Sequence, residues 1–405
     1  MTLSIPANWA DDFFDAIDFG AVGEVYGKLA ADPVGGGRAS VVFPGVSRRR
    51  VEAHIREVRR RGLRFNYLLN ATCLGNAELS RRGQRRIRAL LDWIGETGAD
   101  TVTVALPQLA SLVRRHYPSL RLAVSTNVMA DNLDRVRFWE GLGAQQITLS
   151  YTDVNRDFAE LRHLAAHARC ELQLIVNLIC RRHCPVQALH ANFHSHASQS
   201  GAGPWRGRTL PLDVHCLRCA AHSFTDPTEV IRSHWIRPED LARYEAAGIA
   251  RFKLVERGMN TADLSRIVAA YTARRYDGNL MDLIPTMSKY RYLATPGRMH
   301  FLRHFLGAGG ARPLRLLQLA RRMEALRARP DYFTAFGLYV DNRMLDGFLD
   351  RFERRDCRQT LCEACGYCAQ WARRAVRPLG DPADREAAGR VLAGVVDEAE
   401  TGGLF

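Results

Sequence analysis

The sequence predicts an α/β protein built on a (β/α)8 barrel of the TIM type. Short runs rich in β-branched and aliphatic residues recur along the first two thirds of the 405-residue chain. Amphipathic stretches alternate with these runs, and several of the stretches end at glycine. Eight buried strands that alternate with helices favour a barrel. A doubly wound open sheet is the alternative, but no G-x-G-x-x-G fingerprint supports it.

The predicted strands are AVGEVYG (21–27), ASVVF (39–43), RFNYLLN (64–70), TVTVALP (101–107), RLAVSTN (121–127), QITLSY (146–151), ELQLIVN (171–177) and RFKLVER (251–257). Amphipathic patterns predict helices between them at 47–62, 76–98, 131–142, 153–168 and 238–247. The barrel then covers residues 1–295, with a long insertion at 178–237 after the seventh strand. A small helical domain is expected over residues 296–405.

The composition is that of an ordinary globular protein, with 47% hydrophobic and 25% charged residues. No apolar run approaches the ~20 residues of a membrane span, and no basic segment precedes an apolar core at the N-terminus. We therefore expect a cytoplasmic protein without a signal peptide or a membrane partner. In that compartment thiols stay reduced, so the ten cysteines point to metal binding or catalysis before disulfides.

The formal net charge is +14, which permits RNA or another anionic partner. Only three residues are lysines, so arginine supplies almost all of the positive charge. Much of the arginine lies in stretches typical of exposed helix faces, such as SRRRVEAHIREVRRRG. We favour a solvated basic surface over an RNA-binding patch, and RNA remains the less favoured partner.

In (β/α)8 barrels the chemistry takes place at the C-terminal ends of the strands. This rule selects Arg257, Glu256, Asn70 and Cys73 as candidate catalytic residues. The candidate substrate-binding residues, which also follow strands, are Ser125, Thr126, Asn127, Tyr151 and Asn177. A helix cap or loop hydrogen bond is the structural alternative for each of them. Arg257 ranks first, because a guanidinium binds a carboxylate or phosphate through two parallel hydrogen bonds, although it could instead pair with Glu256.

The insertion begins with LICRRHCPVQALHANFHSH, and HCLRC follows further along. Its C-x3-C and C-x2-C pairs predict one metal centre at the barrel mouth, held by Cys180, Cys184, Cys216 and Cys219. Four thiolates can hold a tetrahedral zinc ion or an iron–sulfur cubane, and the spacing leaves both open. Four unliganded buried thiols are the disfavoured alternative.

A second group lies in CRQTLCEACGYC, where Cys357, Cys362, Cys365 and Cys368 follow the pattern C-x4-C-x2-C-x2-C. This spacing is similar to that of ferredoxin loops but lacks their C-P ending, so Cys357 would be the fourth ligand. Zinc is again the alternative. We predict a second 4Fe-4S centre here, separate from the first.

The segments FKLVERG, TADLSRIVAAY and YDGNLMDL, together with LAVSTNVMADNLDRVRFWEGLGAQQITLSY, resemble the collagenase-like proteins of peptidase family U32. The resemblance covers roughly residues 20–295. It implies a barrel with a 4Fe-4S cluster on four cysteines and oxygen-independent hydroxylation of a ubiquinone precursor or of RNA bases, with prephenate as the oxygen source. The CEACGYC segment departs from the better-known members and indicates a divergent subgroup.

The leading hypothesis is an iron–sulfur oxidoreductase that hydroxylates or otherwise modifies a small metabolite or a peptide, with prephenate as a candidate co-substrate. A redox partner or a homologous subunit would supply or accept electrons. An RNA base hydroxylase, a zinc-stapled scaffold without catalysis and a peptidase are the alternatives. The peptidase is the weakest of them on sequence grounds, because neither G-x-S-x-G nor H-E-x-x-H occurs.

Overall fold

The computed structural model describes residues 1–43, 45–200, 212–285, 312–327, 336–355, 357 and 360–404. The expected domain boundary at residues 295 and 296 lies outside these ranges. No helix in the described ranges combines the length and apolar character needed to cross a membrane.

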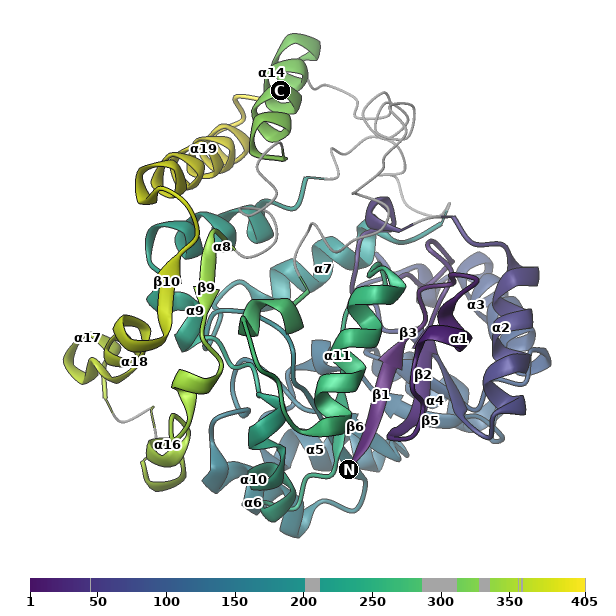
Figure 1. Ribbon diagram of the computed structural model, residues 1–405. Helices are drawn as coiled ribbons and strands as arrows, with labels where there is room; N and C mark the ends of the chain where they lie inside the picture. The colour runs from purple at the N-terminus through teal and green to yellow at the C-terminus, as the bar shows by residue number, and fades with distance from the viewer. Residues whose placement is uncertain are drawn as a thin grey trace.

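Eight parallel strands close into a barrel in their chain order, which confirms the predicted fold class (Figure 1). The strands are β1 (Thr2–Pro6), β2 (Val22–Gly27), β3 (Arg64–Leu69), β4 (Thr101–Val104), β5 (Arg121–Val124), β6 (Gln146–Thr148), β7 (Glu171–Ile175) and β8 (Arg251–Lys253). Pairing of Leu3 with Phe252 and of Ser4 with Lys253 closes the cylinder between β1 and β8.

The predicted strand at 39–43 is wrong, and the strand at Thr2–Pro6 takes its place in the barrel. Residues 40–42 instead form a single 3-10 turn, η1 (Ser40–Val42), in the long loop after β2. Neighbouring parallel strands need a crossover of a dozen or more residues that usually includes a helix. Residues 28–38 are too few for that connection and contain three consecutive glycines.

The helices around the barrel are α1 (Phe13–Ala16), α2 (Arg48–Arg60), α3 (Arg81–Glu96), α4 (Pro107–His116), α5 (Leu133–Gly141), α6 (Phe158–His167), α10 (Leu241–Ala246) and α11 (Thr261–Ala273). Several begin where the sequence provides a cap: the side chains of Ser47, Asn132 and Asn260 accept hydrogen bonds from backbone N–H groups of the first turn. In α2 the buried face carries Val51, Ile55 and Val58, whereas most of the arginines remain exposed.

Polar side chains fill part of the barrel interior and bond to one another across neighbouring strands. Side chains alternate between the two faces of a strand. Leu3, Phe65 and Val102 pack outward against the helices, so the polar residues next to them in the sequence face inward. The hydroxyl of Ser4 donates to Glu24 at 2.7 Å, Thr103 donates to Asn66 at 2.8 Å and Thr148 donates to Gln173 at 3.0 Å.

Two further segments cover one side of the barrel (Figure 1). The insertion after β7 forms α7 (Gln187–Ala197), α8 (Val214–Thr225) and α9 (Thr228–Arg232). The C-terminal segment contains α14 (Pro313–Arg327), β9 (Leu338–Val340), α16 (Asp350–Arg354), α17 (Cys362–Cys365), α18 (Tyr367–Ala375), β10 (Val376–Pro378) and α19 (Pro382–Glu400). Besides the expected helices, this segment contains an antiparallel pair of strands, β9 and β10.

The C-terminal segment docks on the barrel and on the insertion by separate contacts. Phe348 and Phe352 join the core of the barrel, and Phe348 lies against Trp235 with ring centroids 5.7 Å apart. A second apolar cluster joins α8 to α19 through Leu217 and Phe224 on α8 and Leu392 on α19, among others.

Arg237 is one of the buried polar links between the barrel and the C-terminal segment. Its guanidinium contacts both carboxylate oxygens of Asp240 at 2.8 and 3.0 Å and donates to the carbonyl of Asn342 at 2.7 Å. The residue is 2% exposed.

We expect Arg237→Met to lower the free energy of unfolding by about 3–5 kcal/mol, because the buried Asp240 carboxylate would lose its partner. Chemical denaturation of the full-length protein measures this change. The control is Arg266→Ala. The Arg266 side chain is 45% exposed and pairs with Asp263, so its loss should lower the free energy of unfolding by only about 0–1 kcal/mol. Equal effects of the two substitutions would contradict the role given to Arg237.

Candidate active site and cysteine groups

A cavity of ≈ 80 Å³ opens at the C-terminal ends of the barrel strands. Most of the candidate residues selected from the strand ends line it together: Arg257, Glu256, Asn70, Ser125, Thr126, Asn127 and Tyr151. We call it the mouth pocket. Its wall also contains Tyr26, Arg38 and Lys253, which come from β2, the loop after β2 and β8.

Arg257 forms no ion pair among the described residues, although the nearby Glu256 carboxylate raises its pKa against the effect of burial. Glu256 forms its ion pair with Arg38 instead. The Arg257 guanidinium lies over the Phe43 ring at 4.5 Å from its centroid. Held against an aromatic face and without an ion-pair partner among the described residues, this group is suited to bind an acidic ligand.

Lys253 adds a second cation to the pocket. Its ammonium group lies 3.9 Å from the centroid of the Tyr26 ring. Burial lowers the pKa of Lys253 to about 8, although the nearby Glu24 opposes this shift. Since Arg38 neutralises the one carboxylate of the pocket, Lys253 and Arg257 leave it with a net positive charge at neutral pH.

An amide and hydroxyl network forms the opposite wall of the pocket. The Asn70 amide donates to the Ser125 hydroxyl at 3.2 Å, and the Asn127 amide donates to the Asn70 carbonyl at 3.0 Å. The loop after β2, which contains three consecutive glycines at 35–37, packs closely against this network. A Cβ on Gly36 would come within 2.7 Å of the Asn70 side-chain oxygen. A side chain at position 36 would therefore force the Asn70 side chain to shift.

The other two candidates lie outside the pocket lining. The Asn177 side chain is fully buried and donates to the carbonyls of Val255 and Leu283, while it accepts from the Val255 N–H. Asn177 therefore holds the loop after β8 in place through hydrogen bonds to its backbone. The carbonyl of Cys73 accepts from Gln199, and its sulfur accepts from the Gly75 N–H at 3.4 Å. Thr126 lines the pocket, but its hydroxyl donates a hydrogen bond to the Leu149 carbonyl.

The first cysteine group gathers where the loop after β7 meets α8. The hydrogen bond from the Cys180 thiol lowers the pKa of Cys184 to about 6, while the same contact and burial raise the pKa of Cys180. Burial and the nearby Cys184 together raise the pKa of Cys219 to about 11. Burial also raises the pKa of Cys216, and Cys219 adds to that shift. The thiols of this group therefore lie close enough to shift one another's pKa.

Tyr151 joins the first cysteine group to the mouth pocket. It lines the pocket, and its hydroxyl lies close enough to the Cys180 thiol for each group to shift the pKa of the other. Burial raises the pKa of Tyr151 well above its usual value, and Cys180 raises it further. A group bound by the cysteines would thus be separated from a ligand in the pocket by one tyrosine side chain.

All four cysteines of the second group line one cavity of ≈ 310 Å³. Cys362 and Cys365 come from α17, Cys368 comes from α18, and Cys357 precedes them. The barrel and the insertion contribute the opposite wall, which consists of Arg156, Arg182, Arg232 and His234. The cavity is therefore shared between the C-terminal segment and the rest of the molecule.

Arg156 is a buried cation that faces this cavity. It is 5% exposed, and its guanidinium lies 4.6 Å from the centroid of the Trp235 ring and 4.8 Å from that of Phe348. One nitrogen donates to the Ile231 carbonyl, whereas Nε and Nη2 have no hydrogen-bond partner among the described residues. A buried charge requires a counter-charge. Thiolates of Cys368 and Cys357 would supply it, because they raise the pKa of Arg156 against the effect of burial.

Arg182 and His234 place the two cysteine groups next to each other. Arg182 lies between Cys180 and Cys184 in the sequence, yet it lines the cavity of the second group. His234 lines the same cavity, and its Nδ1 contacts the carbonyl of Tyr151 at 3.1 Å.

Arg38, Arg156 and Arg182 are among the site residues that the sequence did not indicate, as are Arg232 and His234. The run of three glycines before Arg38 was an available signal, because it permits close approach of the backbone after a strand. Arg156 offered none, since its role depends on the aromatic residues of a distant segment.

Comparison with known proteins found a matching sequence family, a curated relative and solved structures with some similarity. Residues 38–191 match the sequence family described as peptidase family U32. An uncharacterized protease of Methanocaldococcus jannaschii is 26% identical over 346 residues, which cover 85% of this chain and 86% of the relative. The solved structure of the U32 peptidase Mk0906 is 22% identical with a TM-score of 0.45, over 63% of this chain and 92% of its own. A chitinase from Rhizomucor miehei is 13% identical with a TM-score of 0.37, over 68% and 100% of the two chains.

We expect Cys184→Ser and Cys365→Ser each to remove the metal of one group only, because the two groups have separate ligands. Elemental analysis for iron and zinc on the full-length protein measures the loss. Cys170→Ser is the matched control: Cys170 lies outside both groups, so the metal content should not change. Full metal retention in Cys184→Ser would contradict the first assignment, and full retention in Cys365→Ser the second.

Proposed function

Since this chain belongs to peptidase family U32, we propose that it is an iron–sulfur enzyme that hydroxylates an acidic small metabolite or a peptide without molecular oxygen. The observation that carries this proposal is the position of Tyr151, which lines the mouth pocket and lies close enough to Cys180 for the two groups to shift each other's pKa. A redox-active group on the first cysteines would lie beside a cationic pocket that fits an acid.

The residues around both cysteine groups fit 4Fe-4S clusters. Four thiolates on a cluster carry a net negative charge, and each group has cations nearby. Among the described residues, two nitrogens of Arg156 have no hydrogen-bond partner, and Cys357 and Cys368 lie close enough to raise its pKa. When bound, such clusters supply one-electron redox chemistry. Cys180, Cys184, Cys216 and Cys219 would hold the first cluster, and Cys357, Cys362, Cys365 and Cys368 the second.

The chain's own residues would bind and orient the reactants. Arg257 would hold a carboxylate of the co-substrate through two parallel hydrogen bonds, and Lys253 would add a second positive charge. Prephenate, with two carboxylates and a hydroxyl, is the candidate oxygen donor. A substrate C–H bond would become C–OH, a two-electron oxidation, while the donor loses its oxygen and is reduced by two electrons. Asn70 and Asn127 would orient polar groups of the substrate.

A peptidase is the second candidate, because the relative from Methanocaldococcus jannaschii is described as a protease. In that case the cysteine groups would stabilise the fold, and the protein would cleave peptides with zinc or no metal bound. Peptide cleavage by a zinc-loaded, iron-free protein would favour this candidate over the hydroxylase.

The first test uses protein purified without oxygen. We expect iron and sulfide in stoichiometry, a brown colour and binding of prephenate. Arg257→Lys should keep both clusters and the fold but bind prephenate roughly 10- to 150-fold more weakly, because lysine cannot form the paired hydrogen bonds. Calorimetric titration measures the affinity. A colourless, zinc-loaded wild type would refute the iron–sulfur assignment, and unchanged affinity in cluster-loaded Arg257→Lys would refute the clamp.

The second test is the pH dependence of prephenate binding. Lys253 has a pKa of about 8, so it is cationic below that pH and neutral above it. Carboxylates remain ionised throughout the range, and the affinity should therefore fall as the pH rises from 7 to 9. Lys253→Met should bind more weakly at pH 7 and lose most of the pH dependence. Wild-type affinity that does not change with pH would exclude Lys253 from ligand binding.

A further inference from the structure

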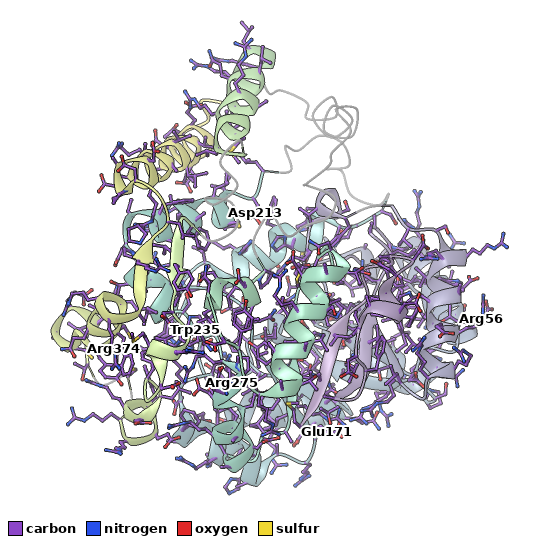
Figure 2. All side chains as sticks on the ribbon, in the orientation of Figure 1. Arg56, Glu171, Asp213, Trp235, Arg275 and Arg374 are labelled. Atoms are coloured by element: carbon purple, nitrogen blue, oxygen red, sulfur yellow. The ribbon has the colours of Figure 1, made fainter. Side chains whose placement is uncertain are left out.

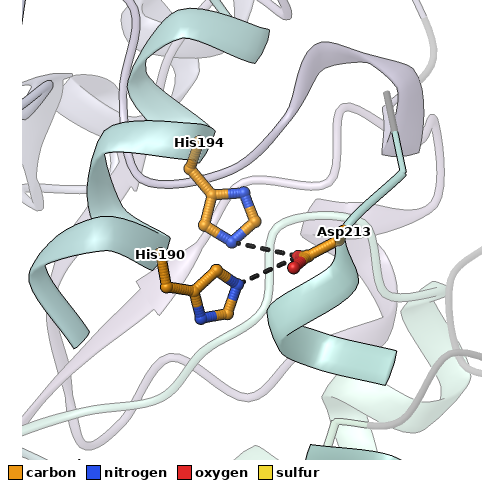
Figure 3. A group of neighbouring side chains, drawn as sticks. All are labelled: His190, His194 and Asp213. Atoms are coloured by element: carbon orange, nitrogen blue, oxygen red, sulfur yellow. Dashed lines mark hydrogen bonds and ion pairs between the residues drawn. The ribbon is translucent and has the colours of Figure 1, made fainter. Parts of the chain in front are cut away.

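Three side chains outside both cysteine groups converge above the barrel: His190, His194 and Asp213 (Figure 3). The Nε2 atoms of the two histidines lie 3.0 and 3.4 Å from the same oxygen, Oδ2 of Asp213. One ligand atom from each of the three residues falls within 4.8 Å of the others. Figure 2 shows Asp213 at the opposite end of the barrel from Glu171, which starts β7, and so on the side of the mouth pocket.

Local structure fixes each of these side chains. His190 and His194 are four residues apart on α7, so they project from one face of the helix. Asp213 caps the N-terminus of α8, where its Oδ1 accepts from the Cys216 N–H at 2.9 Å. That bond leaves Oδ2 to face the histidines.

The helix that carries the two histidines is held against the mouth pocket. The Thr72 N–H donates to the Ser195 hydroxyl at 2.8 Å, and the Gly36 N–H donates to the Ser198 hydroxyl at 2.7 Å. His194 is 7% exposed, and its Nδ1 has no hydrogen-bond partner among the described residues. A buried, anchored pair of imidazoles beside a carboxylate requires little rearrangement to bind a cation.

We propose that His190, His194 and Asp213 bind one divalent transition-metal ion, Zn²⁺ or Fe²⁺. Two imidazole nitrogens and one carboxylate oxygen are the protein ligands of catalytic zinc sites and of mononuclear ferrous sites, and both keep positions open for water or substrate. The ligand set contains no sulfur, which separates this ion from anything that the cysteine groups hold. The inference goes beyond the proposed function and stands without it.

The alternative is a purely structural role, in which Asp213 accepts hydrogen bonds from two neutral histidines and caps α8. The two roles differ in metal affinity. Under the structural role, added metal would leave the spectrum and the thermal stability of the protein unchanged.

The test uses Co²⁺ as a probe on the full-length protein with its cysteine groups loaded. We expect one equivalent to bind with weak visible bands and without thiolate-to-cobalt charge transfer, and to raise the melting temperature. His190→Ala and Asp213→Asn should weaken this binding by more than about 10-fold, because each removes a direct ligand. His196→Ala is the matched control, because His196 is an exposed histidine on the same helix and should leave the affinity unchanged.

Asp213→Asn decides the case if the alanine variant does not fold, since asparagine keeps the size of the side chain and is an equally good helix cap. Wild-type Co²⁺ affinity in this variant would overturn the proposal. So would a wild-type cobalt spectrum dominated by thiolate charge transfer, or no cobalt binding at all. Iron and sulfide analysis of the same samples reports on the cysteine groups independently, so failure of this site is distinguishable from failure of the proposed function.

Discussion

Closure of the barrel between β1 and β8 is the constraint on which the rest of the structure depends. Because all eight strands run in one direction, their C-terminal ends meet at one rim, and residues as distant in sequence as Tyr26, Asn70 and Arg257 share one pocket. The insertion after β7 starts at this rim. Its first residues therefore lie at the pocket, which Leu178 helps to line.

Charge balance is the second organising feature. The molecule buries several cations near its cysteines and its pocket, and buried cations are stable only beside negative charge. Glu256 satisfies Arg38, whereas Arg156 faces thiols and Arg257 lies against Phe43. The basic composition thus has two components. Many exposed arginines pair with nearby acids on their own helices, as Arg60 and Arg61 do with Glu57, while a few buried ones define sites.

The sequence was sufficient for the fold class, for seven of the eight strands and for the grouping of most candidates at the rim, because these depend on local pattern and on one topological rule. The strand predicted at residues 39–43 was wrong, because these residues form a 3-10 turn. The prediction rested on the β-branched residues and did not consider that a crossover between parallel strands needs a longer connection. Asn177 was selected at a strand end by the same rule as the residues that line the pocket. Its amide instead forms hydrogen bonds with backbone groups of a neighbouring loop. The pairing of Arg156 with Trp235 and Phe348 could not be predicted, since it depends on docking of a segment almost two hundred residues away.

The contact between α8 and α19 has a consequence for how the protein matures. Cys216 and Cys219 lie on α8, and the apolar face of this helix is covered by α19, which approaches so closely that a Cβ on Gly389 would come within 3.2 Å of Phe224. During translation α8 leaves the ribosome more than a hundred and fifty residues before α19. Until then its cysteine pair belongs to a helix without its packing partner. The proposed loading of the first cysteine group would therefore follow the docking of α19.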